Sequence, residues 1–245
     1  MSALIEEVLA AHGGAENFAK VRRLRAEMSF GGPFWAGRGW PGILEKTTVE
    51  IDTAREHLTF APFPLAGLYS EYDVGPDGAE TLRFVGTDGP IREERTDPRP
   101  GFPAYDPAVP WDALQTCYFA SAATWNYLMA PFLFARPDVQ SAEVEPWTED
   151  GQTWRRLAVT FPATLPNHNP EQVFYFDDRF LMRRMDYRPD VTGSDIAHYT
   201  DDPREFGGFV FYTRRRVYLR DPDGQARKDF APITIDTSAV SVDRG

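Results

Sequence analysis

Polar and apolar residues alternate along many short stretches of this chain. From Arg23 to Phe30 the odd positions are charged or hydroxyl-bearing and the even positions are apolar. A period of two residues predicts a β-strand with one buried face. Similar stretches recur between turn-forming sequences such as Gly75-Pro76-Asp77-Gly78 and Asp221-Pro222-Asp223-Gly224. Together they predict an antiparallel meander of roughly ten or more strands.

One stretch, from Pro110 to Phe134, breaks this pattern. No charged residue occurs between Asp112 and Arg136. Large apolar side chains recur there at helical spacing, and small residues such as Ala120 and Ala123 lie among them, which predicts a long helix over 111–134 that is buried on several sides. Pro131 should end or kink this helix. A membrane span is the competing interpretation. Polar residues within the stretch disfavour it, and we expect no integral membrane insertion.

The chain before this helix is rich in proline over residues 97–110. Such a run cannot form a central strand or a helix interior, and we interpret it as a crossover that leads the chain into the concave side of the sheet. An apolar pattern at helical spacing also predicts a short helix at the start, ended by His12-Gly13-Gly14. The predicted fold class is therefore α+β and mostly antiparallel β. We expect a single domain over 1–245, with a curved sheet or incomplete barrel wrapped around a long buried helix.

The net charge and the cysteine content argue against some classes of function. The 245 residues carry a formal net charge of -11, which argues against a nucleic-acid partner because phosphate binding needs a basic surface. The single cysteine, Cys117, excludes an internal disulfide and lies in the apolar stretch, where a buried thiol is expected. Residues 1–11 lack the basic and apolar regions of a secretory signal, and on this basis we expect a cytoplasmic protein.

Few residues are arranged for catalysis. The four histidines lack the spacing of a zinc site, and the chain has no nucleophile elbow or phosphate-binding loop, so no metal or cofactor is predicted. The one polar neighbourhood of interest is His198, with Asp186 and Asp201 on adjoining strands. If these strands pair, a carboxylate could orient His198 as a general base. Polar residues at ordinary strand ends explain the same pattern.

Aromatic residues are the remaining signal. The chain contains 18 Phe, 10 Tyr and 6 Trp. Each can be explained as core packing, but the set is larger than a compact sheet of this size usually needs. We therefore predict that several of them line a cavity between the sheet and the helix and bind an apolar ligand. The candidate ligand-binding residues are Trp35, Trp40, Phe60, Phe63, Tyr118, Phe119, Trp125 and Tyr127.

Three segments resemble the LolA-like superfamily, the outer-membrane lipoprotein carriers and related lipid-binding proteins. They are His12-Gly13-Gly14 with the strand that follows, Val173 to Asp177 with Leu181 and Arg184, and Tyr199 to Thr213, where Arg204-Glu205-Phe206-Gly207-Gly208 and the strand beyond resemble the closing strand pair of the family. The resemblance covers about a third of the chain and implies an incomplete antiparallel barrel that holds acyl chains against helices. The carriers are exported, whereas the start of this chain shows no export signal, and the 97–147 region does not match the family residue by residue.

Three functional hypotheses follow from these observations. The leading one is a soluble, non-catalytic protein that encloses a hydrophobic small molecule or lipid. The second is an enzyme acting on an apolar small molecule through His198. The third is a protein-interaction module that uses a sheet edge or an exposed aromatic patch. The oligomeric state is not predicted.

Overall fold

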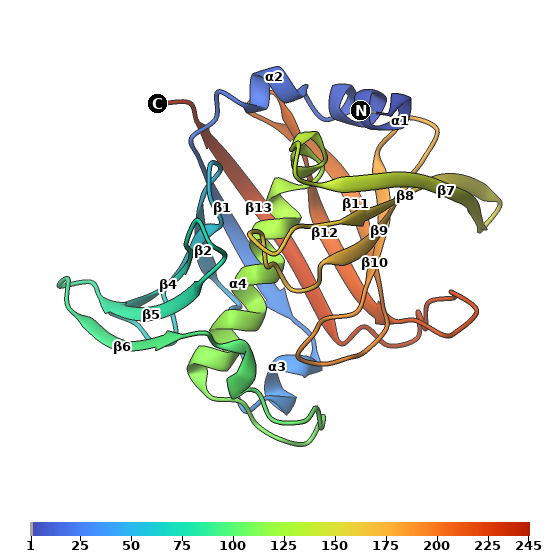
Figure 1. The fold of residues 1–245 in the computed structure, drawn as a ribbon. Coiled ribbons are helices and arrows are strands. Elements are labelled where there is room, and N and C mark those ends of the chain that lie inside the picture. Colours follow the sequence, from blue (N-terminus) through green and yellow to red (C-terminus); the bar gives the residue numbers. More distant parts are fainter. Residues whose placement is uncertain (1) are drawn as a thin grey trace.

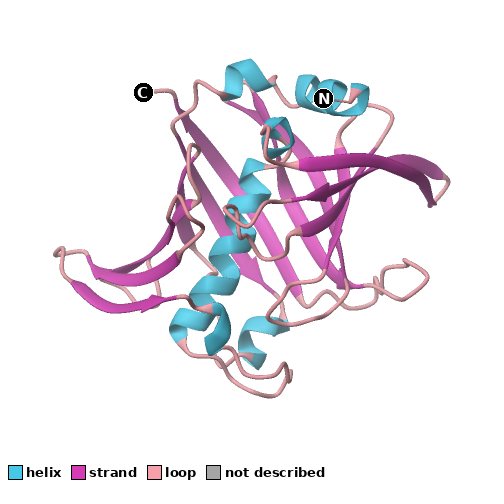
Figure 2. Cartoon of the chain, in the orientation of Figure 1, coloured by secondary structure: helices cyan, strands magenta, loops and turns pink. Residues whose placement is uncertain are grey.

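One continuous antiparallel sheet of 13 strands curves around a central helix, α4 (Ala113–Met129), in the computed structural model, which describes residues 2–245 (Figure 1). Figure 2 shows that helices are few and that strands dominate the chain. The predicted fold class is confirmed. The strands are β1 (Arg23–Gly31), β2 (Thr47–Asp52), β3 (His57–Ala61), β4 (Leu68–Val74), β5 (Glu80–Gly86), β6 (Ile91–Thr96), β7 (Gln140–Glu149), β8 (Gln152–Thr160), β9 (Glu171–Phe176), β10 (Met182–Tyr187), β11 (Ile196–Phe206), β12 (Phe209–Leu219) and β13 (Ile233–Asp243).

The sheet consists of two meanders joined at their first and last strands. Strands β1 to β6 follow one another to one edge, strands β13 back to β7 follow one another to the other edge, and β1 pairs with β13 in the middle. The chain passes from the β6 edge to the β7 edge through the proline-rich segment and α4. This explains why α4 lies across the concave face, where both halves of the sheet can bury it (Figure 1).

In each strand, alternate side chains point to the concave or to the convex face of the sheet. In β1 the even residues from Leu24 to Phe30 are buried and the odd residues from Arg23 to Glu27 are exposed, as the sequence pattern predicts. The hairpin between β11 and β12 turns at Gly207 and Gly208, both at positive φ (58° and 88°), which glycine adopts without steric cost.

Helix α4 is shorter than the predicted 111–134. Asp112 caps its N-terminus in a capping box with Gln115, whose backbone N–H donates to the Asp112 carboxylate over 2.8 Å. The helix ends at Met129, just before Pro131, which has no N–H to continue it. The chain then forms a short 3-10 helix, η2 (Phe132–Ala135). Every side chain of α4 from Leu114 to Met129 is buried except Phe119, which is partly buried, so the prediction of burial on several sides is confirmed.

The other helices cover the ends of the sheet. They are α1 (Ala3–Ala11), α2 (Ala15–Phe18), α3 (Pro33–Gly37) and the 3-10 helix η1 (Arg99–Gly101). After α1, His12 contacts the start of β12. Its Nδ1 lies 2.7 Å from the Val8 carbonyl oxygen and its Nε2 lies 2.8 Å from the Tyr212 hydroxyl. Two of the segments that carry the sequence resemblance, 12–14 and 199–213, therefore meet in space.

A buried ion-pair network lies on the sheet face away from α4. Arg184 is fully buried and donates to Asp186 over 2.6 Å and to Glu149 over 3.1 Å. The Tyr199 hydroxyl donates to Glu149 over 2.5 Å. These contacts hold the β7–β8 hairpin against the β9 to β11 strands.

Candidate functional site

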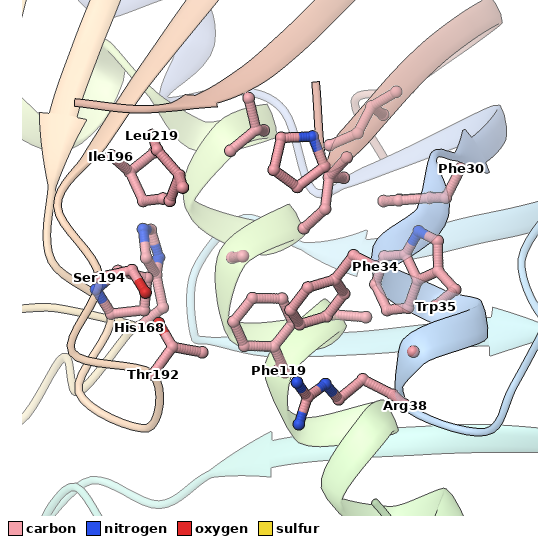
Figure 3. Close-up of a pocket in the computed structure, with 18 of the residues that line it drawn as sticks. Phe30, Phe34, Trp35, Arg38, Phe119, His168, Thr192, Ser194, Ile196 and Leu219 are labelled. Atoms are coloured by element: carbon pink, nitrogen blue, oxygen red, sulfur yellow. The ribbon is translucent and has the colours of Figure 1, made fainter. Parts of the chain in front are cut away.

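A cavity of about 280 Å³ lies between α4, α3 and the concave face of the sheet (Figure 3). Its walls are mostly apolar, and its volume is at the lower end of small-molecule pockets, which hold roughly 300 Å³ or more. The sheet contributes alternate residues of neighbouring strands, namely Val217 and Leu219 of β12 and Ile233 and Ile235 of β13. Period-two alternation places these four aliphatic side chains on the same inner face.

One face of α4 forms the opposite wall. Phe119, Ala120, Ala123, Thr124 and Tyr127 line the cavity, and their spacing of three and four residues places them on one side of the helix. Ala120 and Ala123 end at Cβ and leave room where larger residues would fill the space. The small residues that the sequence interleaves with the aromatic stripe therefore help to create the cavity.

Aromatic rings enclose one end of the cavity. The Phe34 ring stacks on Phe119, with 4.9 Å between the ring centroids, and meets Trp35 edge-on at 5.3 Å. Arg38 lies beneath them (Figure 3), where its Nη1 donates to the Asp106 carbonyl oxygen over 2.8 Å and to the Val109 carbonyl oxygen over 2.7 Å. Arg38 thus joins α3 to the proline-rich crossover.

The rim of the cavity carries exposed apolar side chains. Tyr105 is 40% exposed and Phe230 is 54% exposed, and both border the cavity. Exposed aromatic residues beside an apolar cavity are typical of a site that receives a ligand or a partner.

Four polar side chains, Thr124, Tyr127, His168 and Tyr187, form part of the lining, and we call them the polar wall. The Tyr127 and Tyr187 hydroxyls lie 2.6 Å apart, and the Tyr187 hydroxyl lies 3.1 Å from His198 Nδ1. The His168 ring meets Tyr187 edge-on, with 4.4 Å between centroids.

His168 and Thr124 have unused hydrogen-bonding atoms. Among the described residues, both ring nitrogens of His168 and the Thr124 hydroxyl are buried without a hydrogen-bond partner. Burial, and then the positive charge of Arg99, lower the pKa of His168 to about 3, so its imidazole is neutral at physiological pH. Burial, and then Arg215, likewise lower the pKa of His198 well below its usual value. The polar wall is therefore uncharged.

Arg99 positions the loop that carries His168. Its guanidinium donates to the Pro166 carbonyl oxygen over 2.7 Å and to the Asn167 carbonyl oxygen, and it pairs with Glu80 over 3.0 Å and with Asp190. Arg99 belongs to η1, so the proline-rich crossover determines where His168 sits.

Arg215 precedes Val217 by two residues in β12, so both side chains lie on the inner face of the sheet. It is buried, its Nη2 donates to the Tyr127 carbonyl oxygen over 2.9 Å, and its guanidinium stacks on the Tyr127 ring at 5.2 Å. Burial lowers its pKa to about 10. The Tyr127 ring thus separates this cation from the cavity.

Of the eight aromatic residues predicted to bind a ligand, the structure places three, Trp35, Phe119 and Tyr127, around this cavity. The other five contact protein elsewhere. The Trp40 indole donates to the Trp111 carbonyl oxygen over 2.8 Å, and the Trp125 indole donates to the Asp52 carbonyl oxygen over 3.1 Å. The Phe60 ring contacts the rings of Phe30 and Phe63. The Tyr118 ring contacts the rings of Tyr72 and Phe102.

Four further lining residues, Phe34, Thr124, His168 and Tyr187, were not predicted from the sequence. Phe34 belongs to helix α3, whose five residues are too few to show a helical period in the sequence. The only sequence signal for His168 is its place in a polar, proline-bounded loop.

His198 does not meet either carboxylate that was considered for a general base. In the pairing of β10 with β11, His198 lies opposite Met185, and Asp186 lies opposite Ala197. Adjacent residues of a strand point to opposite faces, so Asp186 points away from His198 and instead binds Arg184 and the Tyr175 hydroxyl. Asp201 lies an odd number of positions from His198 on β11, with Arg183 3.7 Å away.

Comparison with known proteins supports the fold. No family model and no curated protein matches the sequence. A solved outer membrane lipoprotein-sorting protein domain from Vibrio parahaemolyticus matches with a TM-score of 0.54 and 8% identity, over 98% of this chain and 90% of that chain. A DUF1329 family protein from Desulfovibrio piger matches with a TM-score of 0.52 and 12% identity, over 99% of this chain and 93% of that chain. A LolA superfamily protein from Nitrosomonas europaea is similar at a TM-score of 0.43 and 9% identity, over 98% and 94%.

These likenesses define the class of fold: the open, helix-filled sheet of lipoprotein-sorting domains. The resemblance to the LolA-like superfamily is confirmed at that level. No helix within residues 2–245 is both long and apolar enough to cross a bilayer.

The expectation of a cytoplasmic location is wrong. The finding against it is that a solved structure with this fold is an outer membrane lipoprotein-sorting protein domain. The expectation rested on the pattern of residues 1–11. In the structure Leu4, Ile5, Val8 and Leu9 of α1 are buried core residues. Their pattern reflects packing within the domain and carries no information on the compartment.

Proposed function

We propose that this protein is a non-catalytic binding protein that encloses a hydrophobic small molecule or the acyl chain of a lipid between α4 and the concave face of its sheet. The observation that carries the proposal is the apolar cavity of about 280 Å³ inside the curved sheet. The lipoprotein-sorting domain with the same fold supports it by analogy.

The chemistry of the cavity favours binding. Apolar wall atoms that face a void lose dispersion contacts that a chain of methylene groups would restore. Each buried methylene contributes about 0.8 kcal/mol, so about ten methylenes supply the roughly 8 kcal/mol of micromolar binding, before the cost of association is subtracted. The exposed side chains Tyr105 and Phe230 at the rim offer an apolar entrance.

The arrangement of titratable groups supports a non-catalytic role. The polar wall is uncharged, and His198 lies behind Tyr187 with its Nδ1 directed at the tyrosine hydroxyl. A general base would need a proton acceptor that reaches a substrate and a partner that orients it. The geometry around His198 supplies hydrogen bonding between neutral groups instead.

Substitution of Ala123 by phenylalanine tests the proposal. Ala123 faces the cavity from α4, and the added ring would occupy the space for a ligand. We expect the uncharged fluorescent probe N-phenylnaphthylamine to bind the unaltered protein and to bind Ala123→Phe at least about ten-fold more weakly, which corresponds to roughly 1.4 kcal/mol.

The matched control is Ala142→Phe, on the exposed face of β7, which should leave probe affinity unchanged. Far-UV circular dichroism should show that both variants remain folded. Native mass spectrometry of protein from its own host should also detect a bound apolar molecule. Equal probe affinity in Ala123→Phe and the control, or no probe binding by the unaltered protein, contradicts the proposal.

A further inference from the structure

The polar wall has more hydrogen-bonding capacity than the protein uses. A buried polar group without a partner costs free energy, and most such groups in folded proteins are satisfied by protein or water. Here His168 is only 4% exposed and Thr124 is fully buried, yet the described residues offer no partner to either His168 ring nitrogen or to the Thr124 hydroxyl. Both side chains border the same cavity. A bound molecule is the natural source of the missing partners.

The position of His168 fits this role. Figure 3 shows its ring beside Ser194 and Thr192, across the cavity from Phe34 and Trp35. The ring is held by its edge-on contacts with Tyr187 at 4.4 Å and Tyr127 at 5.6 Å, and its backbone carbonyl oxygen accepts from Asp190 N–H over 3.2 Å. The imidazole is therefore fixed in place while its nitrogens remain free. A neutral imidazole offers one N–H donor and one nitrogen acceptor.

The charges around the polar wall define the kind of group that it can accept. Arg215 is screened from the cavity by the Tyr127 ring, and Arg99 is already paired with Glu80 and Asp190. Arg38 lines the cavity as well and donates to two backbone carbonyl oxygens, but it lies beneath Phe34 and Phe119, across the cavity from His168 (Figure 3). An ionised head group placed against His168 would lose its hydration without gaining a direct ionic partner, which is costly in an apolar site. A neutral oxygen pays much less for desolvation and can use both the donor and the acceptor.

We infer that the ligand is an uncharged amphiphile: an apolar chain that carries a hydroxyl or carbonyl oxygen, bound through His168 and Thr124. This inference rests on the proposed function, since it assigns the polar group of the molecule that the cavity encloses. The chain lies along the aliphatic residues of β12 and β13, and the oxygen lies at the polar wall.

The test compares ligands of matched shape. Decanol carries a hydroxyl and chlorodecane does not, and each is used to displace N-phenylnaphthylamine from the unaltered protein and from the variants His168→Phe and Thr124→Val. The phenyl ring keeps the contacts with Tyr187 and removes both nitrogens, and valine keeps the shape of threonine without its hydroxyl. His57→Phe, on the outer face of β3, is the control.

We expect the ratio of decanol affinity to chlorodecane affinity to fall about five- to ten-fold in each cavity variant, which is the scale of one neutral hydrogen bond. The ratio should stay constant in His57→Phe, and ionised decanoate should bind more weakly than decanol at pH 8. The unliganded cavity variants should unfold at the same temperature as the unaltered protein or higher, because an unsatisfied polar group has been removed.

Two results separate this inference from the proposed function. If the probe binds but the affinity ratio is unchanged in both cavity variants, or if decanoate binds more tightly than decanol, the assignment of the polar group is wrong and the enclosing role stands. If the probe does not bind the unaltered protein, both proposals fail.

Discussion

Glu56 offers the sharpest test of the buried electrostatics. It is only 2% exposed, and neither of its carboxylate oxygens has a hydrogen-bond partner among residues 2–245. Burial, and then the negative charge of Glu80, raise its pKa from 4.5 to about 8. Glu80 itself accepts from the Tyr72 hydroxyl over 2.6 Å and pairs with Arg99 over 3.0 Å. Glu56 is therefore protonated in the folded protein at neutral pH.

This pKa shift makes stability depend on pH in a defined direction. The folded state holds the proton more tightly than the unfolded chain, so the contribution of Glu56 to stability is fully present below pH 4.5 and is lost as pH rises through 8. Each unit of pKa difference corresponds to about 1.36 kcal/mol. Between pH 5 and pH 7 the loss from this one group amounts to roughly 2 kcal/mol.

The substitution Glu56→Gln removes the titration and keeps the shape. We expect the stability of Glu56→Gln relative to the unaltered protein to increase by roughly 2 kcal/mol from pH 5 to pH 7. The buried histidines, whose lowered pKa values act in the opposite direction, are common to both proteins and cancel in the comparison. Urea unfolding followed by tryptophan fluorescence at pH 5, 6 and 7 measures the difference.

The control for this experiment is Glu16→Gln, at an exposed position of α2, whose stability difference should not change across the same pH range. A constant difference between Glu56→Gln and the unaltered protein from pH 5 to pH 7 would show that the Glu56 carboxyl titrates alike in the folded and unfolded states. That result would refute the reasoning.

Two further predictions concern stability. Arg184→Leu should destabilise the fold by roughly 3 kcal/mol, because it removes the buried cation shared by Asp186 and Glu149, which keep only the more exposed Arg220, 3.6 Å from Asp186, and Lys228, 2.6 Å from Glu149. Urea unfolding at neutral pH measures this loss, and a loss below about 1 kcal/mol would contradict the prediction. Asp112→Ala removes the capping-box acceptor of α4 and should cost about 1 kcal/mol, visible as a lower unfolding midpoint, whereas Asp112→Asn should recover most of the loss.

Many strands and turns of the sheet can be predicted from the local sequence. The alternation in β1 matches its buried and exposed faces residue by residue, and the predicted turn Gly75-Pro76-Asp77-Gly78 separates β4 from β5. The reason is that strand periodicity and turn geometry depend on near neighbours in the chain. The uncharged stretch around α4 likewise predicts that this helix is buried, because a helix that is apolar on all sides cannot face water.

Local sequence is less informative about helix ends and short helices. The predicted helix 111–134 is divided at Pro131 into α4 and η2, and residues 33–37 fold as helix α3, which the sequence pattern does not predict. A segment this short has too few residues for a period, so its contacts with the rest of the protein decide its conformation.

The cavity itself depends on tertiary structure. From the sequence alone, Tyr118 and Phe119 are equally good candidates for a ligand site, and so are Trp35 and Trp40. The crossing of α4 over the sheet turns Phe119 towards the cavity and Tyr118 towards Tyr72, and α3 buries Trp35 in the lining. His168 reaches the cavity from a loop that Arg99, 69 positions earlier in the chain, helps to fix through the Pro166 and Asn167 carbonyl oxygens. Periodicity tells which side of its own element a residue occupies, whereas only the packing of elements distant in sequence decides whether that side meets protein or a cavity.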